Sequence, residues 1–310
     1  MIMISRRLRL VAWLPGVVAL LTATSVQSQG QGGERRVVLV NVLDQEGNHV
    51  SGLNTANFRG EFRGQPVTIL SVTEDTTPRR IAVVVDVSAS QEQAAVRRWL
   101  QAEQLIDSLI PQHTVALFTV AGTLEKHADL TNDRDALQRA MRDARARRLA
   151  GASSLYDGVV QAALGFPDAS LGDVVCLFSD GVDTSSRRSM DAMVSSVTGK
   201  GVRVFLVATV SDRVAFFREA ESAWRSITEA TGGWMVWIDP SKKENAGAMT
   251  RMTQEMRVRI TSTYRLDLGF PRAVDRSRDW KLQAADSGGR ALRNVRVVYP
   301  HRLTPLANPN

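Results

Sequence analysis

The stretch IAVVVDVSAS, residues 81–90, decides how the rest of the chain is interpreted. Its first five residues are all apolar, which is typical of a short strand that is buried on both faces. The strand then gives way to Asp86, Ser88 and Ser90, three small oxygen-bearing side chains at every second position. Their place at the end of a buried strand calls for either a structural or a chemical explanation.

The sequence around this stretch alternates between buried apolar runs and amphipathic segments. We expect strands at residues 81–87, 114–122, 173–181, 202–210 and 234–239. We expect helices at residues 91–110, 131–148, 154–166, 186–201, 212–233 and 243–264. This order predicts the α/β class, with a doubly wound, mostly parallel sheet that is covered by helices on both faces.

The chain is β-like on both sides of this α/β block. Residues 35–77 contain short apolar runs separated by turns, and residues 263–310 contain three more such runs. Neither end alone has enough strands to close a sheet or sandwich. We therefore predict that the two ends pair into one small β region beside an α/β domain that spans residues 78–262.

The N-terminus has the layout of a secretory signal. Three arginines precede the apolar stretch LVAWLPGVVALLTA, residues 10–23, and small and polar residues follow it. We predict a signal peptide over residues 1–28 and a linker over residues 29–34. An uncleaved anchor is the alternative, but fourteen residues with a proline are short for a membrane span. The mature protein is therefore expected to be secreted, periplasmic or in the cell envelope, without a stable membrane span.

The charge distribution argues against a nucleic-acid-binding protein, and a single cysteine cannot form a disulfide within the chain. Removal of residues 1–28 lowers the formal net charge from +7 to +4, because that segment holds three arginines and no acids. The densest basic run, RDARARR at residues 142–148, ends a predicted helix, where positive charge suits the helix dipole. No aromatic interleaving or nucleic-acid motif accompanies it, so we expect no nucleic-acid partner. The single cysteine, Cys176, is expected to be a small buried apolar residue.

Like the first loop, two further loops of the α/β block are rich in serine and aspartate. They are GASSLYDG, residues 151–158, and FSDGVD, residues 178–183. Ligands of open α/β sheets bind outside the carboxyl ends of the strands, where the three loops can meet. Hydroxyl and carboxylate oxygens suit a hard divalent cation such as Mg²⁺. The alternative for the first loop is structural: Ser90 would cap the next helix and Asp86 would accept hydrogen bonds from loop amides.

In these three loops the sequence resembles the von Willebrand factor A domain. It is most similar to a secreted bacterial branch known mainly from acidobacterial genomes, in which a β segment resembling residues 37–58 precedes the domain and a strand region resembling residues 264–270 follows it. The resemblance extends over roughly residues 35–300 and implies a Rossmann-like doubly wound fold. It also implies a metal-ion-dependent adhesion site, with Asp86, Ser88 and Ser90 in the first loop, Ser153 in the second and Asp180 in the third. The implied cation is Mg²⁺ or Mn²⁺, which would bridge to a Glu or Asp carboxylate of a protein partner.

The second loop departs from the family pattern. It reads Gly151-Ala152-Ser153 where the family has Gly-Gly-Thr, so Ser153 takes the place of the threonine, and Ser154 next to it is an alternative ligand. Asp157 and Asp183 lie close to these loops, and we interpret both as acids that brace the loops.

An enzymatic function is the weaker hypothesis. The sequence contains no Gly-x-Ser-x-Gly elbow and no phosphate-binding Gly-x-x-x-x-Gly-Lys loop. Metal hydrolases usually surround their ion with charged ligands or histidines, whereas the expected ligands here are mainly hydroxyls. We predict a non-enzymatic binding or adhesion module. The alternatives are a structural module of an envelope assembly that uses no metal, and a metal-dependent hydrolase.

Overall fold

The computed structural model describes residues 33–88, 92–146, 151–168, 170–209, 214–238 and 246–306. The predicted signal peptide and Ser90 lie outside these residues. Among the described residues, no helix is both long enough and apolar enough to cross a lipid bilayer.

The centre of the α/β part is a six-stranded sheet with the order β6-β5-β4-β7-β8-β9. Its strands are β4 (Arg80–Asp86), β5 (Thr114–Val120), β6 (Leu124–Thr131), β7 (Val174–Ser179), β8 (Arg203–Thr209) and β9 (Trp234–Ile238). All neighbouring strands are parallel except β5 and β6, which are antiparallel. The prediction of a mostly parallel sheet is confirmed.

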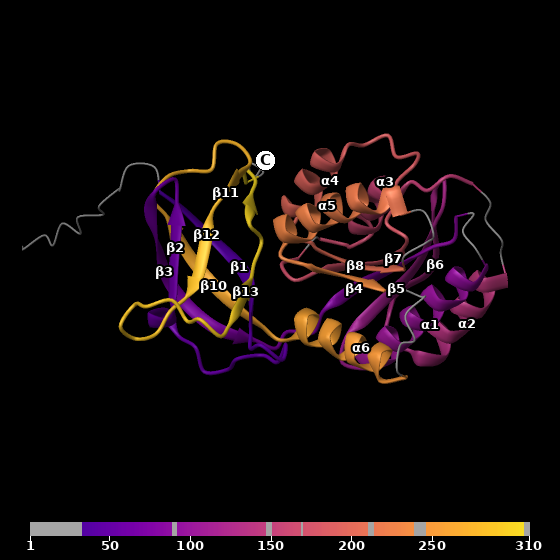
Figure 1. Ribbon diagram of the computed structural model, residues 1–310, viewed down its shortest axis with the longest axis horizontal. Coiled ribbons are helices and arrows are strands. Elements are labelled where there is room, and N and C mark those ends of the chain that lie inside the picture. Colours follow the sequence, from indigo (N-terminus) through magenta and orange to yellow (C-terminus); the bar gives the residue numbers. More distant parts are fainter. Residues whose placement is uncertain are drawn as a thin grey trace, which may run out of the picture. The chain divides into compact units, whose positions relative to one another are not determined.

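Helices cover both faces of this sheet (Figure 1). One face packs against α1 (Glu92–Leu109), α2 (Arg134–Ala146) and α6 (Ala246–Thr261), and the other against α3 (Leu155–Leu164), α4 (Met190–Thr198) and α5 (Val214–Thr231). In β4, Val83 and Val85 point into the first core, while Ala82 and Val84 point into the second. Because both faces are buried, the strand is apolar at every position from Ile81 to Val85.

The second sheet combines the two ends of the chain and has the order β12-β2-β3-β10-β1-β13. Its strands are β1 (Glu34–Leu43), β2 (Phe58–Phe62), β3 (Gln65–Asp75), β10 (Thr263–Phe270), β12 (Lys281–Ala284) and β13 (Arg296–Val298). A short 3-10 helix (Thr55–Asn57) precedes β2, and β11 (Arg278–Asp279) pairs with β14 (Arg302–Leu303). The predicted fold class, an α/β sheet with a β region built from both chain ends, is confirmed. The domain limits 35–77, 78–262 and 263–310 stay a prediction.

Strand β6 is an element that the sequence analysis did not predict. Its residues are half-buried or exposed, and it pairs with β5 at the edge of the sheet. An edge strand with one partner does not need the continuous apolar run that marks β4 or β7. The stretch LEKHADLT therefore carries no strong strand signal.

A buried asparagine links β1 to the α/β part. Asn41 is fully buried in an otherwise apolar run, and its Nδ2 donates to the carbonyl oxygens of Arg259 at 3.0 Å and Ser262 at 2.7 Å. Its Oδ1 accepts a hydrogen bond of 2.6 Å from Nη2 of Arg203, at the start of β8. One side chain thus joins β1 to the end of α6 and to the amino end of the central sheet.

A neighbouring glycine is required by close packing. Gly232, which accepts a hydrogen bond from Arg203 Nε through its carbonyl oxygen, has a φ of +70°. A Cβ at this position would lie 2.6 Å from the backbone nitrogen of Pro300. Glycine alone permits both the left-handed conformation and this approach of the C-terminal segment.

We expect Asn41→Leu to destabilise the protein by at least about 3 kcal/mol, because one buried carbonyl, one partly buried carbonyl and one guanidinium nitrogen lose their partner. Urea denaturation monitored by circular dichroism measures the loss. The matched control is Asn132→Leu at an exposed position, which removes one hydrogen bond of 3.1 Å to the carbonyl oxygen of Pro111 and should destabilise the protein by about 1 kcal/mol at most. A similar small effect for both variants would contradict the role given to Asn41.

The environment of His113 predicts that the free energy of unfolding depends on pH. Its Nδ1 accepts a hydrogen bond of 3.0 Å from the backbone N–H of Arg79, so the folded state favours the neutral ring. Burial and the charges of Arg79 and Arg257 lower the pKa of His113 below its ordinary value of 6.5. The unfolded state therefore binds more protons, and stability falls as the pH decreases from about 7 to about 5.

The variant His113→Asn removes this titrating group and should show a smaller loss of stability over the same pH range. Urea denaturation of both proteins at the two pH values provides the comparison. If the free energy of unfolding of the variant falls between the two pH values by as much as that of the wild type, groups other than His113 cause the effect.

Candidate metal centre

The site begins with the pairing of two parallel strands. In the register of β4 and β7, Val85 lies opposite Phe178, so the next residues, Asp86 and Ser179, meet at the carboxyl edge of the sheet. Both are fully buried, and Ser179 Oγ donates to Asp86 Oδ2 at 2.6 Å. Ser179 was not among the predicted site residues, although it lies directly before Asp180 in the loop FSDGVD.

The second loop brings a further hydroxyl to the same carboxylate. Ser153 Oγ donates to Asp86 Oδ2 at 3.4 Å, and Ser153 is held by Thr184, whose Oγ1 accepts from its backbone N–H at 2.8 Å. The hydroxyl of Ser154 instead forms a 2.7 Å hydrogen bond with that of Ser185. Of the two candidate serines in this loop, Ser153 is therefore the one whose hydroxyl contacts Asp86.

The first and third loops are shaped by their own aspartates. Asp86 Oδ1 accepts a hydrogen bond from the backbone N–H of Ser88 at 2.9 Å, and Asp180 Oδ1 accepts one from that of Val182 at 3.0 Å. Ser88 is half-buried, and the side chain of Asp180 is 17% exposed. This edge of the site is therefore open to solvent, while the carboxylate of Asp86 is not.

A buried arginine connects the two aspartates. Arg98 on α1 is fully buried, and its Nη1 donates to the backbone oxygen of Asp86 at 2.9 Å. The same Nη1 lies 3.9 Å from Asp86 Oδ2, and Nη2 lies 3.9 Å from Asp180 Oδ2. The guanidinium thus places a positive charge next to both carboxylates that were predicted to serve the metal.

Arg98 was not among the predicted site residues, although the sequence contains a signal for it. Arg98 occupies the same helical stripe as Ala102, Leu105 and Leu109, all of which are buried. A charged residue on the core-facing stripe of a helix needs a buried partner of opposite charge. Its partners come from distant loops, so only the folded chain identifies them.

The pKa of Asp180 is shifted by burial and by the charges next to it. Burial raises the pKa of the Asp180 carboxyl above its ordinary value, and the nearby charge of Asp86 raises it further. The backbone N–H of Val182 and the charge of Arg98 act in the opposite direction. Two neighbouring carboxylates are thus held close together with one internal cation.

Two other acids near the site stabilise its loops. Asp183 Oδ1 accepts hydrogen bonds from the backbone N–H groups of Leu155 and Tyr156 at the start of α3, at 2.7 and 3.2 Å. Asp157 accepts from the backbone N–H of Arg187 at 2.8 Å and from Arg188 Nη1 at 2.7 Å. These contacts agree with their interpretation as bracing acids.

The donor chemistry of the site fits a hard divalent cation. Two carboxylates and the hydroxyls of Ser88, Ser153 and Ser179 come from three loops at one edge of the sheet. Among the described residues, no group of three or more His, Cys, Asp and Glu side chains could hold a metal ion. Hydroxyl oxygens with few charged ligands suit a cation that keeps several of its waters, as Mg²⁺ does. Ser90, the remaining predicted ligand, lies outside the described residues.

Comparison with solved structures finds several similar chains of low sequence identity. BatB from Bacteroides thetaiotaomicron is 15% identical, with 58% of this chain and 98% of that chain covered and a TM-score of 0.45. A von Willebrand factor type A protein from Catenulispora acidiphila is 13% identical, with 91% and 76% covered and a TM-score of 0.47. Proximal thread matrix protein 1 from the mussel byssus, with a zinc-occupied MIDAS motif, is 16% identical, with 62% and 49% covered and a TM-score of 0.49.

A comparison with curated protein sequences finds no match. Residues 81–182, however, match the family model of the von Willebrand factor type A domain. The matched stretch begins at the first residue of the IAVVVDVSAS segment and ends two residues after Asp180, so it contains the predicted ligands of all three loops. The chain therefore carries a von Willebrand factor type A domain, of which residues 81–182 form a part.

Proposed function

We propose that this protein is a secreted or envelope-associated binding module that engages a protein partner through Mg²⁺ or Mn²⁺. The proposed ligand set is Asp86, Ser88, Ser90, Ser153 and Asp180. The observation that carries this proposal is the position of the Asp86 carboxylate, which accepts hydrogen bonds from hydroxyls of two other loops at the carboxyl edge of the sheet. This is the edge at which open α/β sheets bind their ligands.

When bound, the cation supplies a coordination position for a carboxylate of the partner. The residues of this chain prepare that position in two ways. Neutral serine hydroxyls leave most of the charge of a divalent ion uncompensated, which favours an anionic partner ligand. Arg98 adds a further positive charge behind the two aspartates, so an acidic partner meets a positive site.

We propose a non-enzymatic role because the side chains around Asp86 suit binding better than the activation of water. The described contacts of its carboxylate are hydroxyls, one backbone N–H and one guanidinium, and Ser179 and Ser153 both donate to it. A group that accepts a proton from a metal-bound water would have to be basic. The proposed location outside the cytoplasm rests on the signal sequence of residues 1–28.

Calorimetric titration of Mg²⁺ and Mn²⁺ into the mature protein tests the metal site. We expect saturable binding in the wild type and a loss of metal affinity of at least about tenfold in Ser88→Ala. Removing a residue that only hydrogen-bonds to a metal ligand already lowers metal affinity by about tenfold or more. The matched control is Ser71→Ala, at an exposed position on β3, which should bind the metal as the wild type does.

Saturable binding that is equal in wild type and Ser88→Ala would place the cation elsewhere. No binding by the wild type, also with a soluble carboxylate such as acetate present to complete the coordination shell, would favour the structural module that uses no metal.

Arg98→Met provides a second and independent prediction. The guanidinium lies 3.9 Å from each of the two carboxylates and competes with an incoming cation for them. Two unit charges about 4 Å apart interact by about 1 to 4 kcal/mol at effective dielectric constants of about 80 to 20. Removal of the guanidinium should therefore raise the affinity for Mg²⁺ by at least about fivefold. Without metal the variant should be less stable, because the two carboxylates lose their counter-charge.

Calorimetry measures the affinity, and thermal unfolding with and without Mg²⁺ measures the stability. The matched control is Arg97→Met, the neighbouring partly exposed arginine, which should change neither quantity substantially. A folded Arg98→Met protein with unchanged or weakened Mg²⁺ binding would contradict the electrostatic role given to Arg98.

A further inference from the structure

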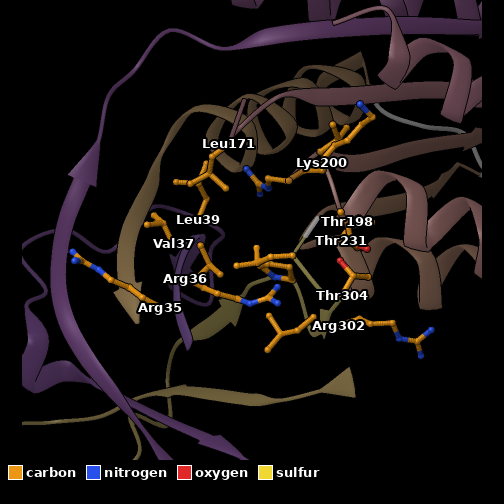
Figure 2. A pocket seen from close by; sticks show the side chains of 18 residues that line it. Arg35, Arg36, Val37, Leu39, Leu171, Thr198, Lys200, Thr231, Arg302 and Thr304 are labelled. Carbon is orange, nitrogen blue, oxygen red and sulfur yellow. The ribbon is translucent and has the colours of Figure 1, made fainter. Parts of the chain in front are cut away.

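A second candidate binding site lies away from the metal centre, at the amino end of β8. A cavity of about 300 Å³ lies there between residues 35–39 of β1, residues 198–203 around the turn from α4 to β8, and residues 302–304. The other lining residues are Leu171, Thr231, Pro300 and Leu306. Figure 2 shows Val37, Leu39 and Leu171 on one side of it and Thr198, Thr231 and Thr304 on the other. Most of the wall is apolar, with one group of hydroxyls.

The charged residues that line the cavity are all basic. They are Arg35, Arg36, Lys200, Arg203 and Arg302, and no aspartate or glutamate belongs to the lining. Three of them have carboxylate partners outside the cavity: Arg35 pairs with Asp267, Arg36 with Glu34, and Arg302 with Asp279 and Asp191. Within the part of the chain that the structure describes, Lys200 and Arg203 have no such partner.

Arg203 is the unusual member of this group because it is 3% exposed. Its Nε donates to the carbonyl oxygen of Gly232 at 2.8 Å and its Nη2 to Asn41 Oδ1 at 2.6 Å, and both acceptors are neutral. Its Nη1 is buried and has no acceptor among the described residues. Burial without a counter-charge lowers the pKa of Arg203 to about 9.

A purely structural role accounts for only part of these observations. The hydrogen bonds to Asn41 and Gly232 explain two of the three nitrogens of Arg203, as links from β8 to β1 and to the turn between α5 and β9. They do not explain the third nitrogen, the uncompensated charge of Lys200 at the rim, or the open space next to them. A buried cation without a carboxylate is costly, and an anion close to it removes that cost.

We propose that this cavity binds a small amphiphilic oxyanion, with a carboxylate or phosphate head near Arg203 and Lys200 and an apolar chain against Val37, Leu39 and Leu171. A guanidinium group can donate two hydrogen bonds to the oxygens of either head group, the planar carboxylate or the tetrahedral phosphate. The volume is near the lower end of ligand pockets, which run from about 300 to 1,000 Å³, so a single short alkyl chain fits better than a two-chain lipid. The proposal goes beyond the metal-dependent function and uses none of its residues.

Calorimetric titration of decanoate, decyl phosphate and decanol into the mature protein, below their aggregation concentrations, tests the proposal. We expect saturable binding of at least one anion with an affinity at least about tenfold higher than that of decanol, because the alcohol lacks the charge. The two anions distinguish a carboxylate ligand from a phosphate ligand. The variant Ser88→Ala should bind the anion as the wild type does, which separates this site from the metal centre.

Two substitutions locate the binding without disturbing the bonds of Arg203. Lys200→Glu, at an exposed position, should weaken anion binding by at least about fivefold through charge reversal, whereas Lys281→Glu, at an exposed position outside the cavity, should have little effect. Leu171→Trp should fill the cavity and weaken the binding of all three probes. Equal affinity for decanol and the anions, no binding of any probe, or wild-type binding in both Lys200→Glu and Leu171→Trp would overturn the proposal.

Discussion

The carboxylate of Asp86 is buried at the end of the central strand, and a charge in that position must be satisfied by other parts of the chain. A backbone N–H of its own loop, hydroxyls from two other loops and the guanidinium of α1 all contribute. Each contact involves a different segment, so the buried charge holds the three loops and the first helix together. The cost of burying this charge explains why the edge of the sheet is rich in hydroxyl and amide donors.

The same arrangement creates a competition at the metal centre. The charge of Asp86 raises the pKa of Asp180, and the guanidinium of Arg98 lies 3.9 Å from both carboxylates. A bound divalent cation would take over that stabilising role while being repelled by the arginine. If the site binds metal as proposed, its affinity depends on a balance between two cations, one of which is the guanidinium of Arg98.

The opposite edge of the sheet has the reverse charge. Arginines gather at the amino ends of the strands, where Arg79 contacts Asp75 and Thr263, and Arg203 contacts Asn41. Arg259 near the end of α6 is also largely buried, and burial lowers its pKa to about 10. Arg79 has a carboxylate partner in Asp75, whereas the hydrogen-bond acceptors of Arg203 are both neutral. This buried charge without a carboxylate is what favours an anion in the cavity beside β1. The proposed cation site and the proposed anion site thus lie at opposite edges of the sheet.

The sequence by itself determined the fold class and the position of the site along the chain. Apolar runs such as residues 81–85 can be satisfied only between two layers of helices, and the carboxyl ends of parallel strands must meet at one edge, so Asp86, Ser153 and Asp180 could be predicted as neighbours. Strand β6 could not be predicted, because an edge strand is under little pressure to be apolar. Only the tertiary structure decided that Ser153 rather than Ser154 contacts Asp86, that Ser179 is a third hydroxyl, and that Arg98 joins the two aspartates. The reason is that these contacts depend on side-chain directions and on distances between segments far apart in the chain, which no local pattern of residues encodes.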